Sequence, residues 1–233
     1  MTLLSHLFSW FPVLHGLLVC VILLVTGINS TSSIQAIPGV SGLSGLLGGL
    51  AVLYLLPPLL FRMHQTAFPL RQGFSSLSDT TYSPWWGGHQ IQGLFIALPF
   101  LEAILRLIPG CYTAWLRLWG ARVGAKVYWT PRVEILDRSL VEIGPGVIFG
   151  HKVVLCSHVL IRRGNQLKLY VRRIQIGEGC LIGALSKLGP GARVAPKVSL
   201  PYRTDVGVNQ KFPAQANALF DEKLEVQMEL SQK

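Results

Sequence analysis

Two histidines, His151 and His158, lie in the C-terminal half of the chain, seven residues apart. Imidazole titrates near neutral pH, so either ring could take up or release a proton during a reaction. A zinc site needs three or four ligands, and no third candidate ligand accompanies this pair in the sequence. The two histidines therefore point to proton transfer rather than to a metal centre. A histidine on a surface loop, without a chemical role, is the alternative interpretation.

The elements that must position these histidines form a repeat with a period of six residues. Ten hexads follow one another from Val123, and their first position is always apolar. Their second position is glycine in six of ten hexads, and their fifth position is always small or β-branched. A period of six fits neither a helix face nor a simple strand, but it is typical of short strands joined by tight corners and stacked into coils. The first positions are Val123, Trp129, Ile135, Ile143, Phe149, Leu155, Ile176, Ile182, Leu188 and Val194.

Two interruptions break this period. The step from Ile135 to Ile143 is eight residues, which leaves two extra residues at a corner. The step from Leu155 to Ile176 is twenty-one residues, which predicts a basic loop from His158 to Arg173 that projects from the stacked coils. Loops on a rigid scaffold are where chemistry is usually placed.

The repeat from Gly120 to Pro201 resembles the hexapeptide-repeat acyltransferases. The segment from Leu155 to His158, followed by the basic loop and a return through Ile176-Gly177, resembles the galactoside, maltose and xenobiotic acetyltransferases of that superfamily. The resemblance implies an all-β domain, a left-handed parallel β-helix of three to four coils with an external loop. It also implies a homotrimer, with the active sites between subunits.

The same resemblance implies a chemistry and a set of site residues. His158 would be the general base that takes a proton from the acceptor as it attacks a thioester, and His151 is the alternative base. The donor would be acetyl-CoA or another acyl-CoA, bound in the groove between neighbouring subunits. Its expected contacts are Ala184, Lys187, Pro196 and Arg203. No metal is expected, although carbonic anhydrases that share this fold would carry zinc on three histidines.

The first 61 residues contain no Asp, Glu, Lys or Arg, which predicts a membrane anchor. Leu7–Ile28 and Val40–Phe61 are apolar runs of the length that a bilayer-spanning helix needs, and a short polar connector joins them as a transmembrane helical hairpin. The chain start lacks Lys and Arg and the first run is long, so a cleaved signal peptide is not expected. The nearest basic residues, Arg62 and Arg71, follow the second run, which predicts cytoplasmic termini and a multi-pass protein of the inner (cytoplasmic) membrane.

These patterns predict four segments. Residues 1–61 form two transmembrane helices, and residues 62–119 form a connector with an interfacial or packing helix over Ile91–Gly110. Residues 120–203 form the β-helix acyltransferase domain. Residues 204–233 form a tail with a short C-terminal helix, expected over Ala214–Leu230.

Composition excludes several classes of function. Half of the 233 residues are hydrophobic and 14% are charged, which excludes a disordered protein or a nucleic-acid-binding tail. From Cys111 onward eighteen basic residues stand against nine acidic ones, so the water-facing half favours anionic partners such as nucleotide phosphates or acidic headgroups. No nucleic-acid partner is expected.

Together, the sequence predicts a membrane-anchored acyl-CoA-dependent O- or N-acyltransferase, most simply an acetyltransferase. Its acceptor would be a saccharide, a glycolipid or another lipid-linked molecule, or a peptide at the membrane. A β-helix without catalytic activity, serving as the scaffold of a membrane complex, is the alternative from a different class.

Overall fold

A computed structural model describes residues 2–32, 40–77, 81–164 and 166–213. Contacts divide the chain into two compact units. The first comprises Met1–Leu70 and Ser78–Leu98, and the second comprises Arg71–Leu77 and Pro99–Lys233. The expected helix over Ala214–Leu230 lies outside the described residues.

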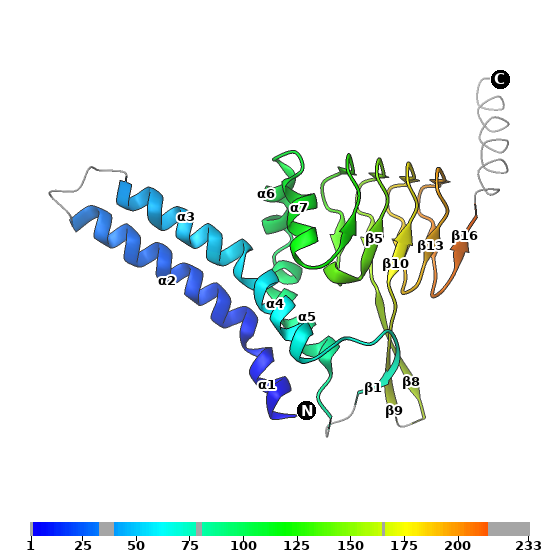
Figure 1. Ribbon diagram of the computed structural model, residues 1–233, viewed down its shortest axis with the longest axis horizontal. Helices are drawn as coiled ribbons and strands as arrows, with labels where there is room; N and C mark the ends of the chain where they lie inside the picture. Colours follow the sequence, from blue (N-terminus) through cyan, green and yellow to red (C-terminus); the bar gives the residue numbers. More distant parts are fainter. Residues whose placement is uncertain (1, 33–39, 78–80, 165, 214–233) are drawn as a thin grey trace. The chain divides into compact units, whose positions relative to one another are not determined.

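The first unit is helical in its described residues (Figure 1). Two stretches, Leu3–Thr26 and Leu43–Ala67, are long and apolar enough to cross a membrane, and a third would be added if the bent helix pair Pro84–Ala97 and Phe100–Arg106 formed one span. Small residues allow the two apolar helices to approach closely. A Cβ on Gly45 would collide with Thr26, and one on Gly49 would lie 2.8 Å from Leu23 Cδ2. The helices of this unit are α1 (Leu3–Ser9), α2 (Phe11–Ser32), α3 (Val40–Tyr54), α4 (Leu56–Ala67) and α5 (Pro84–Ala97).

One helix over Ile91–Gly110 was expected, and this prediction is wrong. Helix α5 already begins at Pro84, with Ser83 as its N-cap, and ends at Ala97. A new helix, α6 (Phe100–Arg106), begins after Pro99. Proline lacks an N–H and disfavours helical geometry in the residue before it, which accounts for the break at Leu98.

The second unit contains three parallel sheets, which we call faces 1, 2 and 3, stacked like a left-handed β-helix (Figure 1). Each coil of the chain contributes one strand to each face in turn, so the described residues form four coils and the first strand of a fifth. Edges 1–2, 2–3 and 3–1 are the corners between these faces. Face 1 consists of β2 (Arg122–Val123), β5 (Val141–Ile143), β10 (Ile174–Ile176), β13 (Arg193–Val194) and β16 (Lys211–Phe212). Face 2 consists of β3 (Tyr128–Trp129), β6 (Ile148–Phe149), β11 (Leu181–Ile182) and β14 (Ser199–Leu200). Face 3 consists of β4 (Glu134–Ile135), β7 (Val154–Leu155), β12 (Lys187–Leu188) and β15 (Asp205–Val206).

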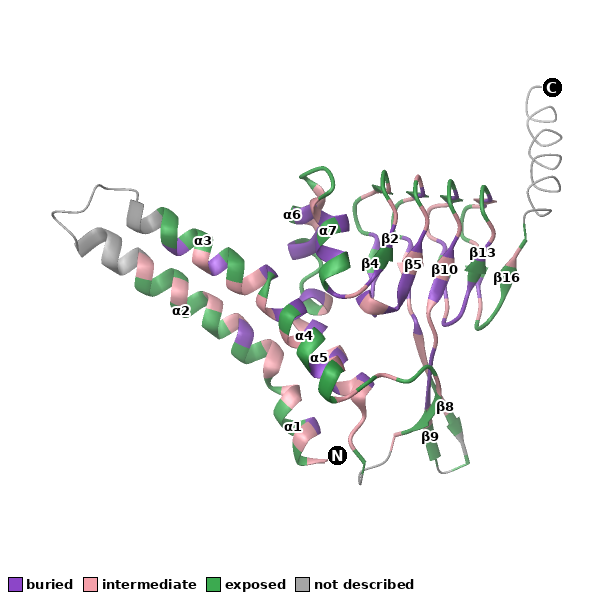
Figure 2. Ribbon diagram, viewed as in Figure 1, coloured by how far each residue is buried: buried purple, intermediate pink, exposed green. Residues whose placement is uncertain are grey.

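The hexad positions occupy the interior of these coils, as the repeat predicts. Nine of the ten apolar first positions are buried, and Figure 2 shows buried segments recurring along the strands of the coils. The tenth, Trp129, is half-buried and stacks on Phe149 with ring centroids 4.8 Å apart. The period also continues beyond Val194, because Leu200, Val206 and Phe212 end the next three strands.

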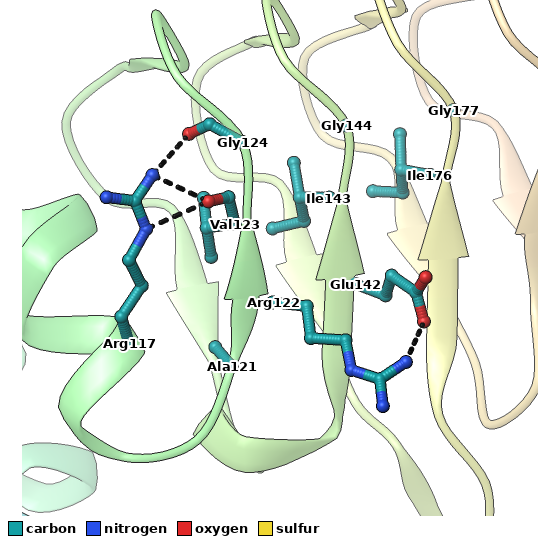
Figure 3. A pocket seen from close by; sticks show the side chains of 10 residues that line it. All are labelled: Arg117, Ala121, Arg122, Val123, Gly124, Glu142, Ile143, Gly144, Ile176 and Gly177. Atoms are coloured by element: carbon teal, nitrogen blue, oxygen red, sulfur yellow. Dashed lines mark hydrogen bonds and ion pairs between the residues drawn. The ribbon is translucent and has the colours of Figure 1, made fainter.

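Helix α7 (Cys111–Leu118) packs against the first coil. Its Arg117 donates hydrogen bonds to the Val123 carbonyl from Nε and Nη2, at 2.9 and 2.7 Å, and Nη2 donates to the Gly124 carbonyl at 3.1 Å (Figure 3). These carbonyls belong to the first coil, so Arg117 supplies donors that a preceding coil would otherwise provide. The hollow of about 570 Å³ beside Arg117 extends from this first coil to Ile176 and Gly177 on the third coil, and its Arg122 and Glu142 pair with each other at 3.6 Å.

Two segments interrupt the coils at edge 3–1. The two extra residues after β4 form a short 3₁₀ helix, η1 (Arg138–Leu140). The predicted loop after β7 is a hairpin of β8 (His158–Arg163) and β9 (Gln166–Val171). Strand β1 (Gly73–Ser76) pairs antiparallel with β9, which the sequence analysis did not anticipate.

Candidate active site

His158 is the first residue of the hairpin that leaves the stacked coils. The preceding Cys156 is still part of the coil, because its N–H donates to the Leu188 carbonyl at 3.0 Å. The Ser157 carbonyl accepts from the Arg172 N–H at 2.9 Å where the hairpin returns. Across the hairpin His158 is opposite Val171. The imidazole thus stands at the root of the hairpin, with 16% of its side chain exposed.

Asp137 holds the imidazole of His158. The distance from Asp137 Oδ2 to His158 Nδ1 is 2.7 Å, and the Asp137 side chain is 3% exposed. A carboxylate only accepts hydrogen bonds, so Nδ1 carries the proton in this contact and Nε2 is the basic nitrogen of the neutral ring. This Asp–His pair has the geometry of an oriented general base.

Three further hydrogen bonds fix the pair. The Ser157 N–H donates to Asp137 Oδ2 at 3.0 Å, and the Ser157 hydroxyl donates to the Leu140 carbonyl at 3.0 Å. The Cys156 thiol donates to the His158 carbonyl at 3.2 Å, with its sulfur 3.7 Å from His158 Nδ1. The η1 segment and the root of the hairpin are therefore joined by side chains on both sides.

The surroundings make the imidazole a strong base. Burial lowers the pKa of His158, but the hydrogen bonds and charges of Asp137 and Cys156 outweigh it and raise the pKa to about 10. The negative carboxylate at 2.7 Å stabilises the imidazolium, which explains the direction. At neutral pH the ring is protonated, and neutral imidazole becomes more abundant as the pH rises.

A buried charge cluster anchors the residue next to Asp137. Arg138 is 1% exposed, and its guanidinium donates to Glu102 Oε1 of α6 from Nη2 and, at 2.9 Å, from Nε. The other Glu102 oxygen accepts from Arg106 at 3.0 Å and from the Tyr112 hydroxyl at 2.6 Å. Burial, together with the charge of Glu102, raises the pKa of Tyr112, which keeps its hydroxyl a donor.

Aromatic rings complete this anchor. The Arg138 guanidinium lies 5.6 Å from the ring centroid of Trp115 and 5.7 Å from that of Trp119. Buried charges are tolerated only when they are paired and hydrogen-bonded, and this cluster meets both conditions. Helices α6 and α7 thereby fasten η1 and, through it, the carboxylate that faces His158.

The predicted donor contacts are distributed over the stack. Ala184 and Arg203 lie on edge 2–3 in successive coils, where the Arg203 N–H donates to the Ala184 carbonyl at 2.9 Å. Lys187 follows Ala184 on strand β12 and is exposed. Pro196 lies on edge 1–2, and His158 lies on edge 3–1. One chain therefore brings Ala184, Arg203 and Lys187 together, but neither Pro196 nor His158 joins them.

His151, the alternative base, is exposed and also lies on edge 2–3, where its carbonyl accepts from the Leu185 N–H at 2.8 Å. Asp137, Arg138 and Glu102 were not among the predicted site residues. The signal that could have found them is the eight-residue step from Ile135 to Ile143, because a buried Asp-Arg pair occupies the insertion.

Comparison with known proteins gives similarity of fold at low identity. No family model matches the sequence, and no curated protein matches it. The hexapeptide-repeat acetyltransferase of Vibrio cholerae, solved with acetyl coenzyme A, is 16% identical with a TM-score of 0.36, over 51% of this chain and 84% of that one. Soybean serine acetyltransferase, solved as the apoenzyme, is 18% identical with a TM-score of 0.25, over 78% of this chain and 64% of that one. Isoform 3 of serine acetyltransferase from Entamoeba histolytica, solved with cysteine, is 11% identical with a TM-score of 0.20, over 82% and 69%. The chain is a distant structural neighbour of hexapeptide-repeat acetyltransferases.

Proposed function

We propose that this protein is a membrane-anchored acyl-CoA-dependent acyltransferase that acetylates a hydroxyl or amine, with His158 as the general base. The observation that carries the proposal is the Asp137–His158 pair, 2.7 Å apart at the root of a hairpin that projects from rigid coils. The buried carboxylate orients the imidazole and fixes its tautomer, which is what a general base needs. The acceptor classes are those that the sequence suggests: a saccharide, a glycolipid or a peptide.

The proposed reaction uses the two ring nitrogens differently. Nε2 of His158 removes the proton from the acceptor hydroxyl or amine as that atom attacks the thioester carbonyl. The carbon–sulfur bond then breaks, the acyl group stays on the acceptor, and the imidazolium returns the proton to the departing CoA thiolate. Asp137 stabilises the imidazolium throughout, and the raised pKa of His158 expresses this stabilisation.

The donor would bind at edge 2–3. Ala184 leaves space for backbone contact, and the cations Lys187 and Arg203 suit the phosphates of CoA. Since His158 lies on a different edge of the same chain, a complete site needs His158 of one copy and the donor edge of another. This requirement supports the proposed homotrimer.

The outer surface of face 2 also supports self-association. Tyr128, Ile148 and Leu181 are neighbours in register on successive coils and are 62%, 45% and 44% exposed. The matching outward positions of face 1 are Arg122, Glu142, Gln175 and Arg193. An apolar stripe on one outer face, beside a charged one, is the pattern of a surface covered in an assembly.

The membrane anchor supports the location of the reaction. Two to three helices are long and apolar enough to span a bilayer. We place the coils on the cytoplasmic side of the inner membrane, because the basic residues near the spans follow the second one and acyl-CoA is cytoplasmic.

The test is His158→Ala, with His6→Ala as the matched control because His6 is exposed on α1 and belongs to no proposed site. Titration calorimetry of the full chain in detergent with acetyl-CoA measures donor binding, and CoA release with saccharide, glycolipid and peptide acceptors measures turnover. We expect His158→Ala to bind acetyl-CoA as a trimer but to lose at least 100-fold in turnover, and His6→Ala to retain both binding and turnover. The proposal is contradicted if His158→Ala does not change turnover, or if the folded trimer does not bind acetyl-CoA. Either result favours a scaffold.

A further inference from the structure

A groove of about 660 Å³ lies between α6 and the outer side of edge 2–3. Its volume is within the usual range for small-molecule sites. The wall formed by the start of α6 is apolar and consists of Pro99, Phe100 and Ala103. The wall formed by the coils carries Arg132, Lys152 and Lys187, with Val154 and Leu185 among them, and Val154 is in register with Lys187. The groove is therefore amphipathic, with an apolar side on α6 and a mainly cationic side on the coils.

The other charged lining residues do not cancel this cationic wall. Arg106 is already engaged by Glu102 at 3.0 Å and by the Val133 carbonyl at 2.7 Å. Glu134 is the acidic residue among those that line the groove, against the three cations Arg132, Lys152 and Lys187. The wall thus keeps an excess of positive charge toward a ligand.

Backbone conformation gives a second, independent observation at this edge. The corner residues of the four described coils on edge 2–3 are Arg132, Lys152, Leu185 and Arg203, with φ of 64°, 55°, 62° and 55°. Left-handed φ favours glycine, and side chains there are strained. At the corresponding corners of edge 1–2, glycine takes two of the four places, Gly146 and Gly179.

Edge 2–3 therefore keeps large side chains where glycine would relieve strain, and three of the four are cations. Residues held in sparsely populated conformations cluster at binding and catalytic sites. Two of these cations, Arg132 and Lys152, line the groove on adjacent coils, about 4.8 Å apart by the strand spacing. That spacing lets both reach one phosphate.

We propose that this groove binds an anionic amphiphile, with an alkyl chain against α6 and a phosphate between Arg132, Lys152 and Lys187. The chemistry fits two sources: an acyl-CoA, which carries both an acyl chain and phosphates, and a phosphate-bearing membrane lipid. With an acyl-CoA as ligand the proposal rests on the proposed transfer reaction, whereas with a membrane lipid it is independent of that reaction. Binding requires His158 in neither case. A His158→Ala variant should bind the ligand as the unaltered protein does.

The test uses the full chain in phosphatidylcholine nanodiscs, titrated with octyl phosphate in a calorimeter against empty nanodiscs. Saturable binding is expected, at least tenfold tighter than that of inorganic phosphate, because only octyl phosphate fills the apolar wall. Octyltrimethylammonium should not bind. Equal binding of the cationic amphiphile, or no difference between octyl phosphate and phosphate, overturns the proposal.

Two glycine substitutions separate the ligand from general effects of charge and strain. Lys152→Gly should weaken the binding of octyl phosphate about tenfold. The thermal midpoint of the variant should stay the same or rise, because glycine relaxes the left-handed backbone conformation at this corner. The matched control is Lys126→Gly, since Lys126 has a φ of 56° and the same charge but lies on edge 1–2. It should show the same thermal change and unaltered affinity. Equal affinity losses in both variants would mean a diffuse charge effect and no site.

A third variant tests the apolar wall. Ala103→Trp fills the groove and should abolish octyl phosphate binding, whereas Ala114→Trp on the exposed side of α7 should not. Competition then identifies the source. Displacement by lauroyl-CoA at concentrations where CoA is inert supports the donor chain, and displacement by lysophosphatidate supports a membrane lipid. Displacement by neither overturns the proposal.

Discussion

Replacement of Asp137 by Asn removes one charge from the candidate site and little else. The side chain keeps its size, and its amide oxygen can still accept from the Ser157 N–H, which donates to Asp137 Oδ2 at 3.0 Å. What changes is the electrostatic field at His158. The variant therefore measures how much of the basicity of His158 comes from the carboxylate.

The size of the pKa change follows from the separation of the two charges, which is larger than the 2.7 Å between the closest atoms because each charge is spread over its group. Unit charges about 4 Å apart attract by about 4 kcal/mol at an effective dielectric constant near 20. Since about 1.4 kcal/mol corresponds to a tenfold change in proton affinity, loss of the Asp137 charge should lower the pKa of His158 from about 10 to about 7. In the variant burial still lowers the pKa of His158 and the hydrogen bond with Cys156 still raises it, so the change in pKa reports the loss of the carboxylate charge.

Two measurements on the full chain in detergent test this shift. Nitrogen-15 NMR of the imidazole, assigned by its absence in His158→Gln, gives the pKa directly. The thermal midpoint against pH gives the same information by linkage. The folded-state pKa is above the unfolded value of about 6.5, so the contribution of the ionised pair to stability is complete below pH 6.5 and is lost as the pH rises to about 10. Asp137→Asn should reduce the dependence of the thermal midpoint on pH between pH 6.5 and about 10.

Asp205→Asn is the control, because Asp205 is an exposed carboxylate on β15 of the same stack. It should leave both measurements unchanged. If His158 titrates near 10 in Asp137→Asn, or near 6.5 in the unaltered protein, the carboxylate does not set the basicity of the imidazole and the argument for an oriented base fails.

Further variants test the anchor, the coil corners and the base. Glu102→Gln should destabilise the protein by about 3 kcal/mol in chemical denaturation, because it leaves buried guanidinium groups without a carboxylate counter-charge. An unchanged denaturation midpoint would mean that water reaches the cluster. Gly183→Ala should lower the free energy of unfolding by about 1–3 kcal/mol, because the new Cβ would lie 2.6 Å from the Leu200 carbonyl oxygen. Gly189→Ala should be nearly neutral, because its Cβ would have its nearest neighbouring atom at 3.4 Å. Equal thermal midpoints in the two variants would contradict the predicted steric clash. The proposed transfer reaction should accelerate about tenfold per pH unit from pH 7 and level off near pH 10, since only neutral His158 accepts a proton. A kcat/KM profile that is flat above pH 7 contradicts that assignment.

The coils could be predicted because their interior imposes a strict rule on sequence. A residue that fills the inside of a coil recurs every six positions, and positions such as Ile143 and Ile176 meet in register one coil apart. Misassignments occur where the rule stops. Val159 satisfies the fifth position of a hexad by residue type, yet it lies in the hairpin opposite Tyr170. A small or β-branched residue is as suitable for a hairpin strand as for a coil, so type alone does not separate the two.

Parts of the chain without a period were harder to predict. The pairing of β1 with β9 joins residues almost a hundred positions apart, Gly73 with Val171, and neither segment has an amphipathic pattern that names its partner. The Asp137 contact was hidden for a similar reason. A carboxylate in an insertion is typical of an exposed turn, and only the path of the next coil reveals that Asp137 is buried against His158.

The site owes its position to where the repeat is interrupted. Both interruptions fall on edge 3–1, the first after β4 and the second after β7, and these strands are neighbours with Ile135 opposite Leu155. Adjacent coils are one strand spacing apart, about 4.8 Å, so residues inserted at the same edge of consecutive coils must meet. An insertion of two residues is enough to form η1 and bring Asp137 to His158. The same insertion on either of the other edges would put the width of a face between the carboxylate and the imidazole. The stacked coils therefore set the distance, and the insertion supplies the charge that makes His158 a base.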